Sequence, residues 1–319
     1  MRTLADTVLR VEDLCKEYRT RKGRVVANDH ISFSVNRGDI VAFLGPNGSG
    51  KTSLIKQITG YTTPTSGRVA LFGQTVCGVG GLSRIGYMMQ SRFAHWDHLT
   101  AWDALFYTGR LKKIPKAEIQ THIASLAARL HLEQDLRVVM ETMSGGKKQA
   151  VALACAVIGS PELIILDEPT NALDPEMRQY FWHFLRQTAA AIGATVLLVT
   201  HNIGEIESIA HEVKIFAGAK IIREGSPRSL IKELNRQIRV ELLLKDAESG
   251  VGEDFLADYE KKWSEDRRTL FVYTGEDDVV RCIGEAFSNR RLSARVENIQ
   301  ISRPNLEDVY IKAMGAKFA

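Results

Sequence analysis

The stretch LGPNGSGKTS at residues 44–53 combines three glycines with one lysine and one threonine, and it fits the pattern G-x-x-x-x-G-K-[ST] in full. The apolar run DIVAFLG at 39–45 leads into it, and apolar residues at helical spacing follow over 54–58. In such a strand–loop–helix unit, backbone N–H groups at the helix N-terminus point toward phosphate oxygens. The stretch therefore predicts a phosphate-binding loop. A glycine-rich turn that only joins strand to helix is the alternative, and the flanking pattern argues against it.

The residues of this loop have separate expected roles. Lys51 brings a positive charge to the β- and γ-phosphates of a nucleotide, and the Thr52 hydroxyl is an expected Mg²⁺ ligand. We expect the following residues to bind the nucleotide: Gly45, Pro46, Asn47, Gly48, Ser49, Gly50, Lys51, Thr52 and Ser53.

A second part of a phosphate site is expected where another buried strand ends in acidic residues. The run LIILDEP at 163–169 provides Asp167 and Glu168. Asp167 suits the Mg²⁺ shell, and Glu168 suits a base that polarises water for attack on the γ-phosphate. Acidic residues are common at strand ends, so this pair carries weight only together with the loop. The two elements predict a P-loop nucleotidase without saying which kind.

Strands and helices alternate along most of the chain. Beyond the two elements above, we expect strands at 8–14, 31–35, 67–73, 84–90 and 195–201, with 18–29 as a polar connection. We expect helices at 101–114, 116–132, 145–160 and 175–193. This order predicts an α/β domain over 1–237, with a mostly parallel sheet and a helical insertion at about 91–160.

The pattern changes near the polar segment EGSPRSLIKELNRQ at 224–237. After it we expect strands at 238–245, 268–274 and 292–302, and helices at 252–263, 276–288 and 305–314. These elements predict a small α+β domain over 238–319.

The stretch MSGGKKQ at 143–149 separates the kinds of nucleotidase. Here the chain resembles the ATP-binding subunits of ABC transporters, whose signature is close to L-S-G-G-Q. The resemblance implies a head-to-tail dimer around ATP. In that dimer Ser144, Gly145 and Gly146 of one copy reach the γ-phosphate that is bound by the loop of the other copy.

Other elements of the same family follow in the right order over residues 8 to about 230. Tyr18 is similar to the aromatic residue that stacks on adenine, and Gln90 to the glutamine that links the Mg²⁺ site to the helical insertion. Asp174, in NALD, is similar to the aspartate that crosses the dimer interface, and His201 to the histidine that touches the γ-phosphate.

The resemblance implies a P-loop NTPase fold of the ABC type, with an antiparallel N-terminal β subdomain beside the parallel core. ATP and Mg²⁺ are the implied cofactors. The implied Mg²⁺ ligands are Thr52, Gln90 and Asp167, and the implied catalytic residues are Lys51, Gln90, Glu168 and His201.

Three positions depart from the family pattern: Met143 for Leu, Lys147 for Gln, and Asn171 for Ser. Leu to Met nearly conserves volume, and Asn171 is a small change of polar kind. Lys147 adds a cation close to phosphate, which either assists ATP-driven closure or is solvated. We expect ATP hydrolysis to be retained.

The last segment, RPNLEDVYIKAMG at 303–315, resembles the P-x-L-E-D-V-F tail of subunits paired with ABC-2 type permeases. Those are mostly exporters of drugs, antibiotics, peptides or cell-surface lipids and glycans. As the alternative, Leu306, Val309 and Tyr310 would also form an ordinary docking face for a terminal helix. The aromatic segment SRFAHWDHLT at 91–100 similarly suits either a permease-docking surface or packing of the helical insertion.

Composition limits the cellular setting. With 319 residues, 45% apolar and 25% charged, the chain is typical of globular proteins, and its net charge of +4 is too small to indicate nucleic acid. No apolar run approaches the roughly 20 residues of a membrane span, and the N-terminus lacks a signal pattern. Four cysteines without a CxxC pair favour a reducing compartment. We expect a peripheral protein on the cytoplasmic face of the cell membrane.

Several functional classes remain to be compared. The preferred one is an ATPase homodimer that drives a separate membrane permease, most similar to ABC-2 exporters; an importer ATPase is the close alternative. A soluble ABC ATPase acting on ribosomes or DNA is disfavoured, because the chain has one nucleotide domain, a short interval at 91–143, and no Lys/Arg-rich arm. The presence of Lys51, Glu168 and His201 disfavours a regulatory subunit that does not hydrolyse ATP.

Overall fold

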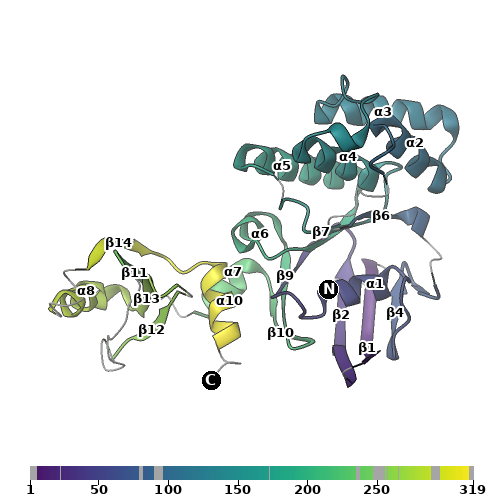
Figure 1. Cartoon of the computed structure of the whole chain (residues 1–319). Coiled ribbons are helices and arrows are strands. Elements are labelled where there is room, and N and C mark those ends of the chain that lie inside the picture. The colour runs from purple at the N-terminus through teal and green to yellow at the C-terminus, as the bar shows by residue number, and fades with distance from the viewer. Residues whose placement is uncertain are drawn as a thin grey trace. The chain divides into compact units, whose positions relative to one another are not determined.

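A computed structural model of the chain (Figure 1) describes residues 6–21, 23–78, 82–89, 96–171, 173–234, 238–246, 256, 258–264, 266–288 and 295–315. Contacts divide the chain into two compact units, Met1–Pro227 and Arg228–Ala319. The division expected from the sequence, at 237/238, lies just beyond the short helix α7 (Pro227–Lys232).

An antiparallel sheet opens the first unit. Its strands are β1 (Thr7–Thr20), β2 (Gly23–Asn36), β4 (Ser66–Leu71) and β5 (Gln74–Thr75), in the order β2-β1-β4-β5. The expected polar connection at 18–29 is wrong, because β1 and β2 form one long hairpin through Thr20 and Gly23. Register shifts between Val11 and Glu17 break the alternation of buried and exposed residues in β1. The alternation in the sequence therefore stops before β1 itself ends.

The central sheet has the order β10-β9-β3-β8-β7-β6, and every neighbouring pair except β10–β9 is parallel. This confirms the predicted mostly parallel core. The β9–β10 hairpin was not predicted. The strands are β3 (Ile40–Leu44), β6 (Ile85–Met88), β7 (Leu163–Asp167), β8 (Thr195–Val199), β9 (Glu212–Ala217) and β10 (Lys220–Gly225).

Three of these strands position the site. Every residue of β3, β7 and β8 is buried, as continuous apolar runs in a parallel sheet should be. Because the three are parallel neighbours, the loops after Leu44, Asp167 and Val199 leave the sheet at the same edge. Such an edge is where open α/β sheets bind ligands.

Helices complete the first unit, and the predicted helical insertion is present. Figure 1 shows α2, α3 and α4 grouped together with α5 nearby. A capping box between Thr100 and Asp103 starts α2. The helices are α1 (Lys51–Ile58), α2 (Ala101–Leu111), α3 (Lys116–Leu130), α4 (Gly145–Val157), α5 (Pro175–Ile192) and α6 (Ile203–Ile209), with 3-10 turns at Leu82–Arg84 and Met140–Thr142. None of the helices in the described ranges is both long and apolar enough to cross a bilayer.

In its described residues the second unit is an antiparallel sheet with helices, in line with the predicted α+β composition. Its strands, in the order β12-β13-β11-β14, and its helices are β11 (Ile238–Leu244), β12 (Glu260–Trp263), β13 (Thr269–Thr274), β14 (Val296–Ser302), α8 (Val279–Ser288) and α10 (Leu306–Gly315), with a 3-10 turn at Glu276–Asp278.

One element of this unit was predicted wrongly. The expected helix at 252–263 ends as strand β12, where Glu260 pairs with Tyr273 and Trp263 with Leu270. Strand β13 offers an open edge whose backbone groups need partners, and this non-local pairing overrides the weak helical pattern of EKKW. Residues 252–255 and 257 lie outside the described ranges.

The tail segment packs onto its own unit. Leu306 and Val309 are buried. Asp308 is 1% exposed, and its Oδ1 accepts hydrogen bonds from Arg239 Nη1 at 2.9 Å and from the Tyr273 hydroxyl at 2.6 Å. Asp308 of the tail motif therefore has a structural role, which is to hold α10 against the sheet.

Candidate active site

The loop between β3 and α1 needs glycine for reasons visible in its geometry. A Cβ on Gly50 would lie 2.0 Å from the carbonyl oxygen of Ala27, and its φ is +104°. A Cβ on Gly45 would lie 2.5 Å from the carbonyl oxygen of Phe216. Any side chain at these two positions would collide with backbone, so only glycine lets the loop pass this close to its neighbours.

Lys51 begins α1 and folds back over the loop. Its Nζ donates to the carbonyl oxygens of Gly45 at 2.7 Å and Pro46 at 3.0 Å, and lies 3.4 Å from Ser49 Oγ. Burial lowers the pKa of the ammonium, while the carboxylates of Glu168 and Asp167 act in the opposite direction. The lysine is thus desolvated, and phosphate oxygens can replace the two carbonyl oxygens as acceptors of its hydrogen bonds.

Two buried amides support the loop from behind, and the sequence did not single them out. Asn28 Nδ2 donates to the carbonyl oxygen of Gly50 at 3.2 Å. Gln57 Nε2 donates to Asn28 Oδ1 at 2.7 Å and to the Ser53 carbonyl at 3.0 Å. Asn28 and Gln57 are 0% and 1% exposed, so these bonds replace hydration of the loop and the first turn of α1. Asn28 lies in the segment 18–29 that the sequence predicts to be a polar connection, so nothing in the sequence marked it as buried.

The acidic pair lies beside Lys51, at the end of β7. Asp167 is 4% exposed, and burial, with a smaller effect of Glu168, raises its pKa to about 6; Lys51 opposes this shift. Glu168 has φ +51°, which costs a residue with a side chain about 1–3 kcal/mol. Its N–H donates to the Val199 carbonyl at 2.8 Å, which ties it to β8.

Glu168 also contacts the predicted histidine. Its Oε1 lies 2.8 Å from His201 Nδ1, and the His201 side chain is 62% exposed. The other oxygen, Oε2, is buried and has no hydrogen-bond partner within the described part of the chain. A buried carboxylate oxygen without a partner is costly, and its position beside the loop suits an acceptor for water.

Lys51, its loop and the acidic pair border a cavity of about 250 Å³, whereas His201 does not line it. Tyr18 lies at it together with Val25 and Val26, which are 51% and 47% exposed and were not predicted. Lys16 Nζ lies 5.1 Å from the centre of the Tyr18 ring. The cavity is lined by Tyr18, Val25, Val26, Ala27, Asn47, Gly48, Gly50, Lys51, Thr52, Ser53, Asp167, Glu168 and Val199. It therefore combines an apolar wall, a phosphate loop and an acidic pair.

The signature segment lies elsewhere. Ser144 is the N-cap of α4, and its Oγ accepts from the Lys147 N–H at 3.4 Å. Ser144 and Gly145 are exposed, Gly146 is half-buried, and none of the three lines the cavity. Lys147 Nζ pairs with Asp135 Oδ1 at 2.7 Å, so its charge is neutralised by a carboxylate of the segment after α3.

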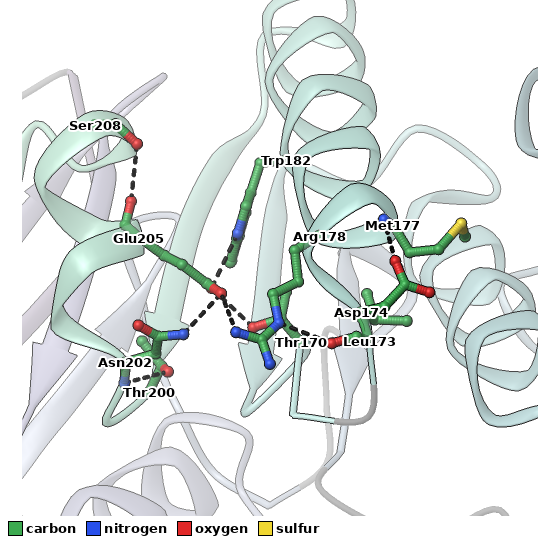
Figure 2. Close-up of polar contacts among 10 residues, drawn as sticks. All are labelled: Thr170, Leu173, Asp174, Met177, Arg178, Trp182, Thr200, Asn202, Glu205 and Ser208. Atoms are coloured by element: carbon green, nitrogen blue, oxygen red, sulfur yellow. Dashed lines mark hydrogen bonds and ion pairs between the residues drawn. The ribbon is translucent and has the colours of Figure 1, made fainter.

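Asp174 is exposed and caps α5, where its Oδ1 accepts from the Met177 N–H at 2.8 Å (Figure 2). One contact ties the signature helix to the acidic strand end: Gln149 Nε2 donates to the Pro169 carbonyl at 2.9 Å. Gln90 falls outside the described residues, as do residues 91–95 of the aromatic segment. The role of that segment, docking or packing, stays a prediction with both readings open.

Known proteins with this arrangement are numerous. The ABC transporter family matches residues 28–171. The Nod factor export ATP-binding protein I of Rhizobium leguminosarum bv. viciae is 33% identical over 304 residues, which cover 95% of this chain and 94% of that protein. The chain belongs to the ABC transporter ATP-binding family. As a member it binds ATP and is an ATPase.

Two further family members frame the comparison. The spermidine/putrescine import ATP-binding protein of Acidothermus cellulolyticus is 32% identical over 220 residues, 69% of this chain and 57% of that protein. A dimeric ATP-binding cassette in a post-hydrolysis state, bound to ADP and Pi, has a TM-score of 0.63 at 24% identity. That structure covers 68% of this chain and 98% of its own, and it confirms the fold.

The apolar wall makes a prediction for ATP affinity. Replacing Tyr18 by alanine removes the ring that we expect to stack on adenine, a contact worth ~1–3 kcal/mol, or roughly 5- to 150-fold in Kd. ATP titration at fixed salt by calorimetry measures this loss. Tyr18→Phe keeps the ring and should bind ATP as the wild type does. Equal weakening by both variants would contradict a stacking role.

Proposed function

We propose that the chain is the ATP-hydrolysing subunit of an exporter, working as a homodimer with a separate permease at the cytoplasmic face of the membrane. One observation carries the choice of export. The export relative matches 95% of the chain, beyond the first compact unit, whereas the import relative matches 69%. The cargo classes stay those of the tail resemblance: drugs, antibiotics, peptides, or lipids and glycans.

In this proposal residues 1–237 form the ATP-binding domain and 238–319 an accessory domain. Tyr18 holds the base, and the loop at 45–53 holds the phosphates. The donor set fits Mg²⁺, because Asp167 is a buried carboxylate and Thr52 a hydroxyl at the same cavity, and oxygen ligands are those that Mg²⁺ prefers. We assign Thr52, Asp167 and Gln90 to it. Bound there, Mg²⁺ would neutralise charge on the β- and γ-phosphates.

Hydrolysis follows from the contacts of Glu168. Its unpartnered Oε2 accepts a proton from water and orients that water toward the γ-phosphate. Oε1 meanwhile holds the exposed ring of His201 through the 2.8 Å contact, next to the carboxylate that we place against the γ-phosphate. Lys51 leaves the carbonyls of Gly45 and Pro46 and stabilises the charge that develops on the phosphate.

The site is completed by a second copy. Ser144 and Gly145 are exposed and lie away from the cavity of their own chain, so their helix N-terminus is free to bind phosphate held by another subunit. Asp174, exposed at the start of α5, takes part in the same interface. The dimeric cassette among the structural relatives supports this arrangement.

The test is purification of the tagged chain from membranes of its own cells, followed by reconstitution with the co-purifying protein. We expect to recover a membrane protein with several spans that raises the ATPase rate. When ATP is hydrolysed, it should move cargo out of the compartment that contains this chain. Cargo movement into that compartment would replace export by import. Recovery with ribosomes or DNA, without a membrane protein, would overturn the permease assignment.

A further inference from the structure

A single carboxylate behind the site, that of Glu205 on α6, receives donors from several directions (Figure 2). Its Oε1 accepts from Asn202 Nδ2 at 2.8 Å and lies 3.6 Å from Arg178 Nη1. Its Oε2 accepts from Thr170 Oγ1 at 2.8 Å and Trp182 Nε1 at 3.0 Å. The Glu205 side chain is only 13% exposed, so these donors replace most of its hydration.

The donors come from three separate segments, and each segment carries a residue assigned to the site. Thr170 stands in the loop after β7, two positions beyond Glu168. Asn202 directly follows His201. Arg178 and Trp182 belong to α5, whose N-cap is Asp174. Glu205 therefore joins three segments. They are the loop that follows Glu168, the loop of His201 and Asn202 (the histidine loop), and α5, whose N-cap Asp174 we place at the dimer interface.

Arg178 strengthens the link to the Asp174 loop. Its Nε donates to the Leu173 carbonyl at 2.8 Å, and its Nη1 faces Glu205 (Figure 2). The histidine loop is fixed on the other side, because the Asn202 N–H donates to Thr200 Oγ1 at 3.0 Å while its side chain holds Glu205. A displacement of either loop would break charge-assisted bonds to one shared carboxylate, so the two loops are linked through Glu205.

We propose that Glu205 is a positioning residue for ATP hydrolysis: it couples the place of His201 to that of Asp174, so that the Glu168–His201 pair is in working geometry only when the dimer-facing loop is also in place. Glu205 does not line the cavity, so it acts through these neighbours. The inference rests on the proposed dimeric hydrolysis and adds to it a connection within each subunit.

The variants for the test are Glu205→Ala, Glu205→Gln and Trp182→Phe, with Ser208→Ala as matched control. Glutamine keeps the shape and one acceptor oxygen, but its amino group faces donors. In Trp182→Phe an aromatic ring stays in place, but the Nε1–H that donates to Glu205 Oε2 is lost. Ser208 lies on the same helix and donates only to the Glu205 backbone carbonyl at 3.0 Å (Figure 2).

We expect Glu205→Ala to lower kcat roughly a hundredfold, as a misplacement of about 1 Å does, while KM for ATP changes less than about threefold. The small effect on KM is expected because the loop at 45–53 and Tyr18 are untouched. Glu205→Gln and Trp182→Phe should each lose roughly tenfold in kcat, since each leaves part of the hydrogen-bonding intact. Ser208→Ala should match the wild type.

A second readout does not need turnover. In the hydrolysis-deficient Glu168→Gln background, adding Glu205→Ala should weaken ATP-induced dimerisation by roughly tenfold, because the Asp174 loop loses its anchor. Sedimentation over a range of protein concentrations measures the constant. An unchanged dimerisation constant would overturn the coupling to Asp174.

Other results would also overturn the inference. A kcat of Glu205→Ala within about threefold of wild type would do so, as would a parallel loss of kcat and ATP affinity that follows a fall in melting temperature. If the alanine variant does not fold, Glu205→Gln and Trp182→Phe carry the test. Absence of hydrolysis by the wild type, with Lys51→Ala as blank, would instead reject the proposed function.

Discussion

Glu168→Gln should lower ATP turnover by roughly a thousandfold while leaving ATP binding close to that of the wild type. The amide is nearly the same shape as the carboxylate but cannot take a proton from water. The buried Oε2, which has no partner within the described residues, is the atom whose basicity is lost. Because ATP is then bound but not consumed, the variant should accumulate as a dimer in Mg-ATP. Phosphate release and size-exclusion chromatography measure the two effects.

The matched control is Glu118→Gln, which makes the same chemical change on the exposed first turn of α3. Surface substitutions of this kind shift stability by about 0.5 kcal/mol or less, so its turnover should equal that of the wild type. Turnover by Glu168→Gln within a few-fold of the wild type would remove Glu168 from its proposed role. A failure to bind ATP would mean that the substitution disturbs the loop at 45–53 instead.

The parts of the site that could be predicted are those whose chemistry is local in sequence. Gly50, Lys51 and Thr52 are adjacent, and Asp167 is the last of the five buried residues of β7, with Glu168 directly after it. Residue pattern alone is enough to place each group at a strand end, and parallel strand order then brings the ends together. His201 was assigned through the family resemblance, in which a histidine follows a buried strand, and not from the residue pattern alone.

The parts that could not be predicted depend on contacts between distant segments. Asn28 supports Gly50 and Gln57 supports Asn28, but neither lies in a pattern that marks it as buried. The donors of Glu205 span residues 170 to 202, and a glutamate on a short helix is otherwise unremarkable. In the second unit, β12 forms because β13 has a free edge beside it. Such pairings are properties of the folded chain and leave no periodic trace in sequence.

Ser144→Ala should lower hydrolysis by roughly a hundredfold or more, the usual effect of losing one donor to a developing phosphate or oxyanion charge. ATP binding by a single subunit should not change, because Ser144 does not line the cavity of its own chain. Lys51→Ala should show the opposite split and lose ATP binding. Loss of the N-cap of α4 costs about 1 kcal/mol, so the fold should persist. Ser125→Ala, exposed on α3, is the control.

Mixing the inactive variants Ser144→Ala and Lys51→Ala tests whether the site is shared between subunits. In a mixed dimer one site pairs an intact Lys51 with Ser144 of the partner subunit, and the other site carries both defects. Random exchange gives mixed dimers for half of the population and one intact site in each, so activity should return to at most about a quarter of the wild-type value. Calorimetry and phosphate release on each variant alone give the baseline. If Ser144→Ala abolishes ATP binding by its own subunit, or leaves turnover intact, then the phosphate site is not composed across two copies of the chain. The exposed N-terminus of α4 would in that case be only a capped helix, and the loop at 44–53 would have to hydrolyse ATP with the residues of one subunit.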